Sequence, residues 1–322
     1  GFIDRGSSLT LPDGTGPGVR ALHLSAAGEV AAPLVPAGIG RPEEFPADTA
    51  GAIAVLTRGT LEFGEKVANA ERAGAAGVIV VNKEPGEFRG SLPAPSNIPA
   101  VSISQADGQA LLAMAGTAAT LKVDTFNGEI DSANVIARPP GGECRVLAGG
   151  HYDSVPHGPG AHDNASGTAV VLELARTVAP ISAQGACFAA FGSEELGLEG
   201  SQAFVSAITD KERQALRVML NFDMVGIGTT WTLIGTDDLI QQGLAFADQA
   251  HIPAVAGKEP PGTGSDHASF FNAGFPVLFF FAGLDANYHT PNDLIGFISK
   301  DELREAGAMG RAAIERALST PA

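Results

Sequence analysis

Short, almost wholly apolar runs alternate with helix-like segments over the second part of this chain, from about residue 132 onward. Such runs occupy residues 145–150, 186–191, 217–222 and 277–281, and a segment with helical spacing, 166–178, separates the first two. Runs this short and this continuously apolar are typical of strands buried on both faces. Their alternation with helices predicts an α/β fold with an open, mainly parallel, twisted sheet that is flanked by helices.

The first part of the chain has a different pattern. Residues 1–30 are rich in Gly, Pro and Ser and predict an irregular N-terminal lead-in. Residues 31–125 then show short strands and one clear helix, at 63–75, with a buried strand directly after it. We expect a small α+β domain at 31–125, with no chemistry of its own because acids, histidines and cysteines do not cluster there, and a catalytic domain at 126–322.

Charge and hydropathy exclude some partners. The 322 residues include 36 acids and 20 bases, which gives a formal net charge of −16. Such a chain repels phosphate backbones, so we expect no nucleic acid partner. No apolar stretch reaches the roughly 18–20 residues of a membrane span. We also expect the protein to be a monomer. The chain begins at Gly1 rather than Met, which predicts a processed or trimmed form without its signal peptide.

The two cysteines, Cys144 and Cys187, leave two interpretations open. Cysteines this sparse are commonly inert core residues. However, Cys144 lies seven residues before His151, and Cys187 lies seven residues before Glu194. If both segments are neighbouring parallel strands that end at one site, the thiols are level with each other, and a disulfide is possible in an oxidising compartment.

The predicted strands are followed by residues that bind metals or move protons. In a parallel sheet the carboxyl ends of the strands share one edge, where ligands bind. Each residue alone has an ordinary explanation, such as a helix cap for Asp163 or a solvated loop for the paired glutamates. Together they predict a metal site, and in chain order they are His151, Asp163, Glu194, Glu195, Asp223, Tyr288 and His289.

The types of donor indicate which metal. Mixed imidazole and carboxylate ligands suit zinc. Two histidines with several carboxylates exceed the needs of one tetrahedral catalytic zinc, and instead suit two zinc ions that share one carboxylate.

Five sequence blocks resemble a known family. HYDSVPHGPGAHDNASG, FGSEELGLEGSQAF, NFDMVG, SDHASF and YHTPNDL are similar, in order and spacing, to the cocatalytic two-zinc exopeptidases that include secreted bacterial and fungal aminopeptidases. The resemblance covers about residues 132–300. Residues 51–112 separately resemble the protease-associated domain, a usually noncatalytic module that often borders or covers a neighbouring cleft. Relatives usually have a longer N-terminal segment than residues 1–30, so we expect a truncated or an unusually compact chain.

The resemblance implies a role for each residue. His151 and Asp223 would hold one zinc ion, Glu195 and His289 the other, and Asp163 would bridge them. Glu194 would be the general base and Tyr288 would contact the developing oxyanion. Of the remaining polar residues, Asp153 would hold the His151 ring through its other nitrogen, and Asp266 would make a contact just outside the ligands. We expect His162 to face solvent, and His267 to shape the substrate pocket or bond locally.

The expected reaction is therefore release of the N-terminal residue of a peptide by a hydroxide held between two zinc ions, with Glu194 moving the proton. Phe270, Phe271, Phe275 and residues 279–281 are mostly core, although they could favour apolar substrates. A secreted or cell-envelope location fits this family. Three alternatives stay open: a dipeptidase or carboxypeptidase on the same scaffold, a single-zinc glutaminyl cyclase, and a noncatalytic receptor-like module.

Overall fold

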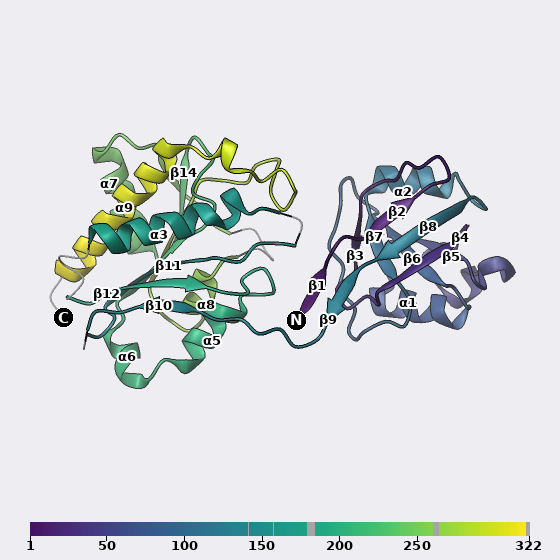
Figure 1. The fold of residues 1–322 in the computed structure, drawn as a ribbon, viewed down its shortest axis with the longest axis horizontal. Coiled ribbons are helices and arrows are strands. Elements are labelled where there is room, and N and C mark those ends of the chain that lie inside the picture. Colours follow the sequence, from purple (N-terminus) through teal and green to yellow (C-terminus); the bar gives the residue numbers. More distant parts are fainter. Residues whose placement is uncertain (141, 157, 179–183, 260–263, 320–322) are drawn as a thin grey trace. The chain divides into compact units, whose positions relative to one another are not determined.

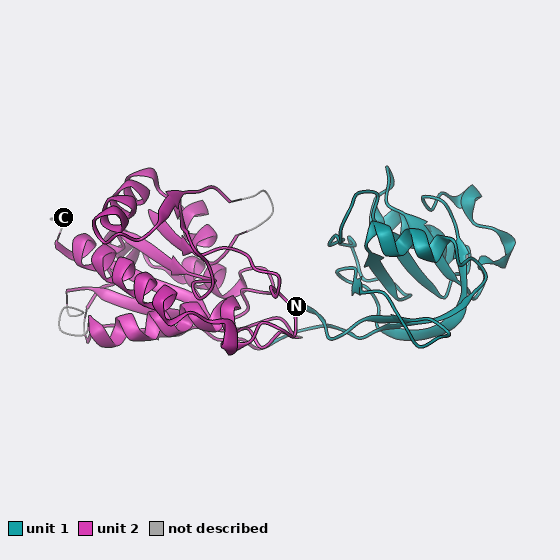
Figure 2. Ribbon diagram, turned by 90° about the horizontal axis from the view of Figure 1, so that it is seen from above, with its two compact units in different colours: residues 1–130 teal, residues 131–322 magenta. Residues whose placement is uncertain are grey.

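The computed structural model describes residues 1–319 except 141, 157, 179–183 and 260–263. The chain divides into two compact units, which we call unit 1 (Gly1–Ile130) and unit 2 (Asp131–Ala322) (Figure 2). Each unit is built around a seven-stranded sheet. Among the described helices, none has the length and hydropathy of a membrane span.

The sheet of unit 1 has parallel strands at its centre and antiparallel strands at both edges. Its spatial order is β2 (Ser8–Thr10), β8 (Ala118–Val123), β4 (Gly28–Pro36), β5 (Ile53–Thr57), β6 (Gly77–Val81), β7 (Ala100–Ile103) and β3 (Val19–Ala21). A separate two-stranded ribbon pairs β1 (Phe2–Asp4) with β9 (Thr125–Asn127). The 3-10 turns η1 (Pro42–Glu44) and η2 (Ala47–Thr49) lie between β4 and β5.

Two helices cover opposite faces of this sheet (Figure 1). Helix α1 (Phe63–Arg72) packs Val67 and Ala70 into a core that contains Val78 and Val80. Helix α2 (Gln105–Leu112), capped by Ser104, packs Leu111 into the other core. Because successive side chains of a strand point to opposite faces, the continuous apolar run GVIVV of β6 supplies both cores.

The expectation of an irregular lead-in at residues 1–30 is wrong. Strands β1, β2 and β3 lie within this segment, and β4 begins at its end. Strands β2 and β3 form the two edges of the sheet, paired with β8 and β7. Each spans three residues between Gly- and Pro-rich turns, which is too short to show the alternation that identifies a strand.

Unit 1 also contains a fully buried lysine. The Lys66 side chain is 0% exposed, and its Nζ donates to the carbonyl oxygens of Thr57, at 3.0 Å, and of Ile39. The ammonium group of Lys66 therefore connects helix α1 by hydrogen bonds to the end of β5 and to the turn after β4. Beside it, the amide of Asn69 donates to the carbonyl of Gly40 at 2.7 Å.

Replacing this ammonium group should destabilise unit 1. Lys66→Met keeps the aliphatic packing but leaves two carbonyl groups without their donor, so we expect a loss of about 2 kcal/mol in the free energy of unfolding. Thermal and urea unfolding of the full chain would measure it. Lys122→Met, at an exposed position of β8, is the matched control. Equal stability of the two variants would contradict the structural role of Lys66.

The sheet of unit 2 is mixed and mainly parallel, as the sequence predicts. Strands β12, β11, β13 and β16 run parallel to one another, with antiparallel pairs on either side of this group. The spatial order is β10 (Val135–Ala137), β12 (Ala186–Phe191), β11 (Val146–His151), β13 (Val218–Phe222), β16 (Val277–Phe281), β14 (Trp231–Gly235) and β15 (Ala254–Ala256).

Helices cover both faces of this sheet and complete a three-layer α/β unit (Figure 1). One face packs against α3 (Ser166–Thr177), α7 (Asp237–Gln249) and α9 (Lys300–Ser319). The other carries α5 (Glu199–Ala207), α6 (Asp210–Ala215) and α8 (His267–Asn272). The short turns η3 (Ala161–Ala165) and η4 (Ile295–Phe297) lie in connecting loops. The predicted α/β class is confirmed.

The cysteines form a disulfide, which resolves the alternative left open by the sequence. Cys144 and Cys187 are joined with Cα atoms 5.4 Å apart. In the register of the parallel neighbours β11 and β12, Leu147 is opposite Cys187. Cys144 is therefore not level with Cys187, but lies in the segment that leads into β11. The bond therefore crosslinks the end of the sheet opposite to His151, the last residue of β11.

Removing this crosslink should destabilise unit 2 without changing its metal chemistry. The bond closes a loop with a sequence separation of 43, for which the chain-entropy model gives about 4 kcal/mol. We expect the double variant Cys144→Ala, Cys187→Ala to lose a stability of this order, measured by chemical unfolding, while its zinc content stays the same. A reducing agent should destabilise the unaltered chain but not the variant. A variant as stable as the unaltered chain would contradict this role.

Candidate metal centre

The carboxyl ends of the parallel strands bring the predicted residues together. His151 is the last residue of β11, Asp223 directly follows β13, and Glu194 and Glu195 follow β12. Asp163 lies in η3, just before α3, and His289 lies in the loop after β16. Glycine allows α3 to approach closely, because a Cβ atom at Gly167 would lie 2.1 Å from the carbonyl oxygen of Phe222.

Two groups of potential ligands share one carboxylate. In the first, His151 Nε2 lies 3.2 Å from Asp163 Oδ1 and 3.3 Å from Asp223 Oδ1. In the second, His289 Nε2 lies 3.0 Å from Asp163 Oδ2 and 3.0 Å from Glu195 Oε2. The ligand atoms within each group lie within 4.8 Å of one another. The two oxygens of Asp163 thus face different histidines, as a bridging ligand requires.

The chemistry of these residues fits metal ions. His151 Nε2, Asp223 Oδ1 and Glu195 Oε1 are buried and have no hydrogen-bond partner among the described residues. Buried polar atoms without a partner cost free energy, and carboxylates this close repel one another. Bound cations would relieve both costs. The mixture of imidazole nitrogen and carboxylate oxygen is one that zinc accepts.

The pKa values of the metal-free groups show the same crowding. Burial raises the pKa of Glu194 to about 10, and the negative charges of Asp223, Asp266 and Glu195 add to this rise against the attraction of His151. Burial likewise raises the pKa of Asp266 to about 7. A nearby cation favours the ionised carboxylate, so a bound metal would bring these pKa values down.

The pKa values of His151 and Asp163 shift in opposite directions. Burial alone would lower the pKa of His151, but Asp223, Asp153 and Asp163 raise it well above its ordinary value. Burial alone would raise the pKa of Asp163, but the close His151 and His289 rings hold it well below its ordinary value. Without metal, the histidine rings therefore balance part of the negative charge.

Asp153 lies at the second ring nitrogen of His151 and also at the loop that bears Glu194 and Glu195. His151 Nδ1 lies 3.1 Å from the backbone oxygen of Asp153 and 3.6 Å from its carboxylate. The carboxylate accepts the backbone N–H groups of Glu194 and Glu195, at 3.1 and 3.3 Å. The carbonyl of Asp153 thus orients the ring, while its side chain fixes the loop that bears the two glutamates.

His162 does not face solvent, contrary to the expectation. It is 0% exposed, and both ring nitrogens lie within hydrogen-bond distance of backbone groups. The sequence shows only that His162 precedes Asp163, whereas its partners are more than 60 residues away, with separations of 64 and 121. Burial of this kind has no local sequence signal.

Sequence reasoning also missed Asp293, although it lies within the quoted block YHTPNDL. Its two carboxylate oxygens accept the backbone N–H groups of His162 and Asp163, at 2.7 and 3.1 Å. Asp293 is 3% exposed. The only sequence signal for Asp293 is that it is an acidic residue without an assigned role inside a block whose other residues resemble the family.

Other predicted residues lie around the centre. The Tyr288 ring stacks on His289, with centroids 3.8 Å apart. His267 Nε2 lies 2.9 Å from Glu259 Oε1, and its ring stacks on Phe279. Phe270 and Phe275 belong to a hydrophobic core, as expected for most of these aromatic residues. His157, which also lies in the first block, is outside the described residues.

The backbone at the centre is unusual. Ser193, Met224 and His289 have φ angles of 58°, 53° and 56°, a left-handed conformation that is uncommon for residues with side chains. Ser193 precedes Glu194, and Met224 follows Asp223. All three positions thus lie at a ligand or beside a predicted functional residue, where such conformations tend to cluster.

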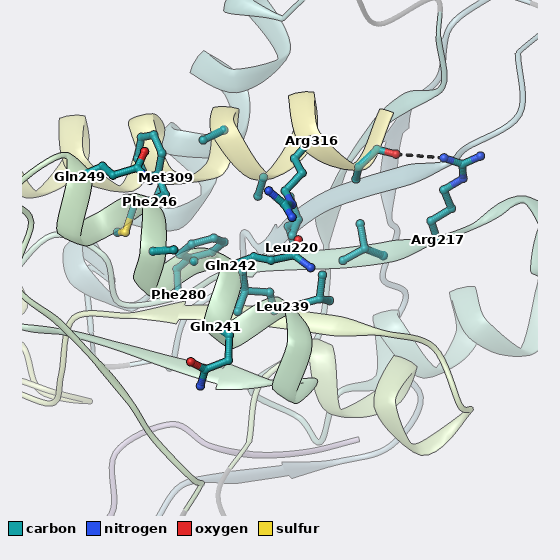
Figure 3. A pocket seen from close by; sticks show the side chains of 17 residues that line it. Arg217, Leu220, Leu239, Gln241, Gln242, Phe246, Gln249, Phe280, Met309 and Arg316 are labelled. Carbon is teal, nitrogen blue, oxygen red and sulfur yellow. Dashed lines mark hydrogen bonds between the residues drawn. The ribbon is translucent and has the colours of Figure 1, made fainter. Parts of the chain in front are cut away.

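A cavity of about 570 Å³ lies elsewhere in unit 2, between α7, α9 and the sheet (Figure 3). Leu220, Leu278 and Phe280 of the sheet line it, with Arg217 and Arg316 toward one end. None of the described lining residues is acidic or a histidine, so this cavity offers no metal ligands and is distinct from the centre at the strand ends.

Comparison with protein families gives two matches. Residues 134–314 match peptidase family M28, and residues 30–111 match the PA domain. The first match covers the strands that end at the candidate metal centre. The second lies within unit 1, whose described residues contain neither of the two groups of potential metal ligands.

Individual relatives agree with these matches. Aminopeptidase YwaD of Bacillus subtilis is 36% identical over 89% of this chain and 67% of its own length. Leucine aminopeptidase 2 of Trichophyton rubrum is 29% identical over 80% of this chain, which spans 60% of that relative. Among solved structures, BSAP, a zinc aminopeptidase from Bacillus subtilis, has a TM-score of 0.72 and 34% identity over 98% of this chain and 82% of its own.

The predicted resemblance is thereby confirmed, because a family model covers more than half of the chain and a close relative aligns along most of it. This protein belongs to peptidase family M28, as a zinc-dependent peptidase with a PA domain.

Proposed function

We propose that this peptidase is a secreted aminopeptidase that binds two zinc ions at the candidate metal centre. The observation that carries the proposal is the shared carboxylate, since Asp163 presents one oxygen to His151 and the other to His289. One carboxylate between two ligand groups is the arrangement expected of two metal ions about 3.5–4 Å apart.

The two ligand groups define the two zinc positions. His151, Asp223 and Asp163 would hold one ion, and Glu195, His289 and Asp163 the other. Each ion then has three protein ligands, which leaves coordination open for water or substrate, as in catalytic zinc sites. When bound, zinc lowers the pKa of a water molecule toward 7 and polarises a carbonyl group.

Glu194 is placed to move the proton. Its backbone N–H is fixed by Asp153, and its carboxyl lies close enough to His151, Asp223 and Glu195 for their charges to shift its pKa. As a carboxylate it can accept a proton from the attacking water and pass that proton to the leaving amine. Tyr288, next to His289 in the chain, is the residue proposed to donate a hydrogen bond to the developing oxyanion.

The charge of the centre supports action on free amino termini. Asp163, Glu194, Glu195, Asp223 and Asp266 form a negative site that suits an ammonium group. The relatives named above are aminopeptidases. The Cys144–Cys187 disulfide supports secretion, because such bonds persist mainly in oxidising compartments. The proposed substrate is therefore a peptide with a free N-terminus. We also propose that the enzyme acts as a monomer.

Glu194→Gln tests the assignment of the general base. The amide has nearly the same shape but cannot accept the proton, so kcat should fall about 10²–10⁴-fold with two zinc ions still bound. Metal analysis and peptide hydrolysis would measure both quantities. Glu199→Gln, at an exposed position in the same segment, should keep full activity. Loss of zinc from Glu194→Gln would show that Glu194 is a ligand instead.

A dipeptide series tests the end of the substrate that is recognised. We expect the zinc-loaded protein to cleave leucyl dipeptides with a free amine at least about 100-fold faster than their N-acetylated forms, because a site that binds the amine is left unpaired by the acetylated substrate. Hydrolysis would be followed by chromatography. Faster cleavage of acetylated peptides with a free carboxylate would identify a carboxypeptidase. Cleavage of neither would refute the proposed activity.

A further inference from the structure

His162 occupies the centre of three loops without being a metal ligand. Its Nδ1 accepts the backbone N–H of Gly226, at 3.2 Å, and its Nε2 lies 3.1 Å from the carbonyl oxygen of Gly283. An imidazole nitrogen that accepts an N–H carries no proton, so the proton is on Nε2 and is donated to Gly283. The ring thus links two backbone groups through its two nitrogens, and Nε2 also lies 3.9 Å from Asp285 Oδ2.

The two bonds of this ring connect ligands of different metal positions. Gly226 lies three residues after Asp223, a ligand of the first position, and Gly283 lies six residues before His289, a ligand of the second. The residue after His162 is Asp163, which belongs to both. One side chain therefore links the three segments whose relative placement sets the spacing of the two metal positions.

Backbone contacts hold the segment around His162 in place. Its N–H and that of Asp163 donate to the carboxylate of Asp293, and its carbonyl oxygen accepts the hydroxyl of Ser166, at 2.7 Å. The same hydroxyl accepts the N–H of Val225, at 3.0 Å. Because these bonds fix the main chain of His162, the hydrogen bonds of its ring also fix the positions of Gly226 and Gly283 in the two other loops.

We infer that His162 is a positioning residue that sets the spacing between the two metal positions, by tying the loop of His289 to the loop of Asp223 across the bridging Asp163. This inference rests on the proposed two-zinc site. It assigns a role to a residue that binds neither metal nor substrate, and it requires both hydrogen bonds of the ring.

Three substitutions separate the two hydrogen bonds. His162→Phe removes both of them and keeps a ring in the buried space. His162→Asn places an oxygen near the position of Nδ1 and can still accept the N–H of Gly226. His162→Gln places an amide nitrogen near the position of Nε2 and can still donate to Gly283. Only the glutamine variant retains the tie to the loop that carries His289.

The test measures zinc binding to the full chain by calorimetry, in titrations that start from the metal-free protein. We expect two zinc ions in the unaltered chain, and in His162→Phe an affinity about 10-fold lower for the more weakly held ion, the magnitude typical for residues that orient metal ligands. His162→Gln and His162→Asn each keep one of the two hydrogen bonds, so each should recover only part of this affinity. With both positions filled, kcat should still fall in His162→Phe while KM changes little.

A control separates this role from a general loss of stability. The double variant Cys144→Ala, Cys187→Ala removes the disulfide at the end of the sheet opposite to the metal centre, and should lower the melting temperature without changing zinc affinity. The inference is overturned if His162→Phe behaves like this control, or if the asparagine or the glutamine variant binds both zinc ions as tightly as the unaltered chain. Failure of the proposed two-zinc site would already be visible as one zinc ion, or none, in the unaltered chain.

Discussion

The structure depends on keeping several buried carboxylates at one edge of a sheet. Asp163, Asp223 and Glu195 lie within hydrogen-bond range of only two histidine rings, with Glu194 and Asp266 close by. At such distances in a low dielectric, the repulsion between like charges is worth several kcal/mol. The rise in the pKa of Glu194 to about 10 without metal is a direct consequence of burial and this repulsion. Two zinc ions would turn the same cluster from a repulsive arrangement into an attractive one.

Backbone groups, rather than further charged side chains, hold this cluster in place. The carboxylates of Asp153 and Asp293 each accept two consecutive backbone N–H groups, those of the Glu194 loop and of the Asp163 segment. Peptide N–H groups stabilise a carboxylate by hydrogen bonding, and the carboxylate of Asp153 also lies 3.6 Å from His151 Nδ1. These two acids therefore hold the segments that carry the ligands. At the other end of β11, the disulfide and the apolar core hold the strands themselves in place.

The sequence predicts those parts of the structure that local patterns determine. Continuous apolar runs identify β11, β12, β13 and β16, since strands buried on both faces need no alternation. The residues that follow them converge because parallel strands end at one edge. Strands β2 and β3 were missed because three residues between turns carry no periodicity. The burial of His162 was not predicted, because its contacts depend on which loops meet in space and residue type alone does not record them.

A peptidase of this kind needs a rigid metal cluster, and hydrogen bonds among the segments that carry the ligands provide it. The ligands come from the end of β11 and from four further segments, and hydrogen bonds to Asp153, His162 and Asp293 hold the backbone of these segments. Left-handed residues beside the ligands, such as Met224 and His289, are uncommon conformations that persist only where surrounding bonds determine them. At Met224 the backbone N–H donates to the side-chain oxygen of Asn164, at 3.3 Å, and the N–H of Val225 donates to the hydroxyl of Ser166. Side chains of the Asp163 segment and of α3 thus hold the loop that carries Asp223 in its uncommon conformation.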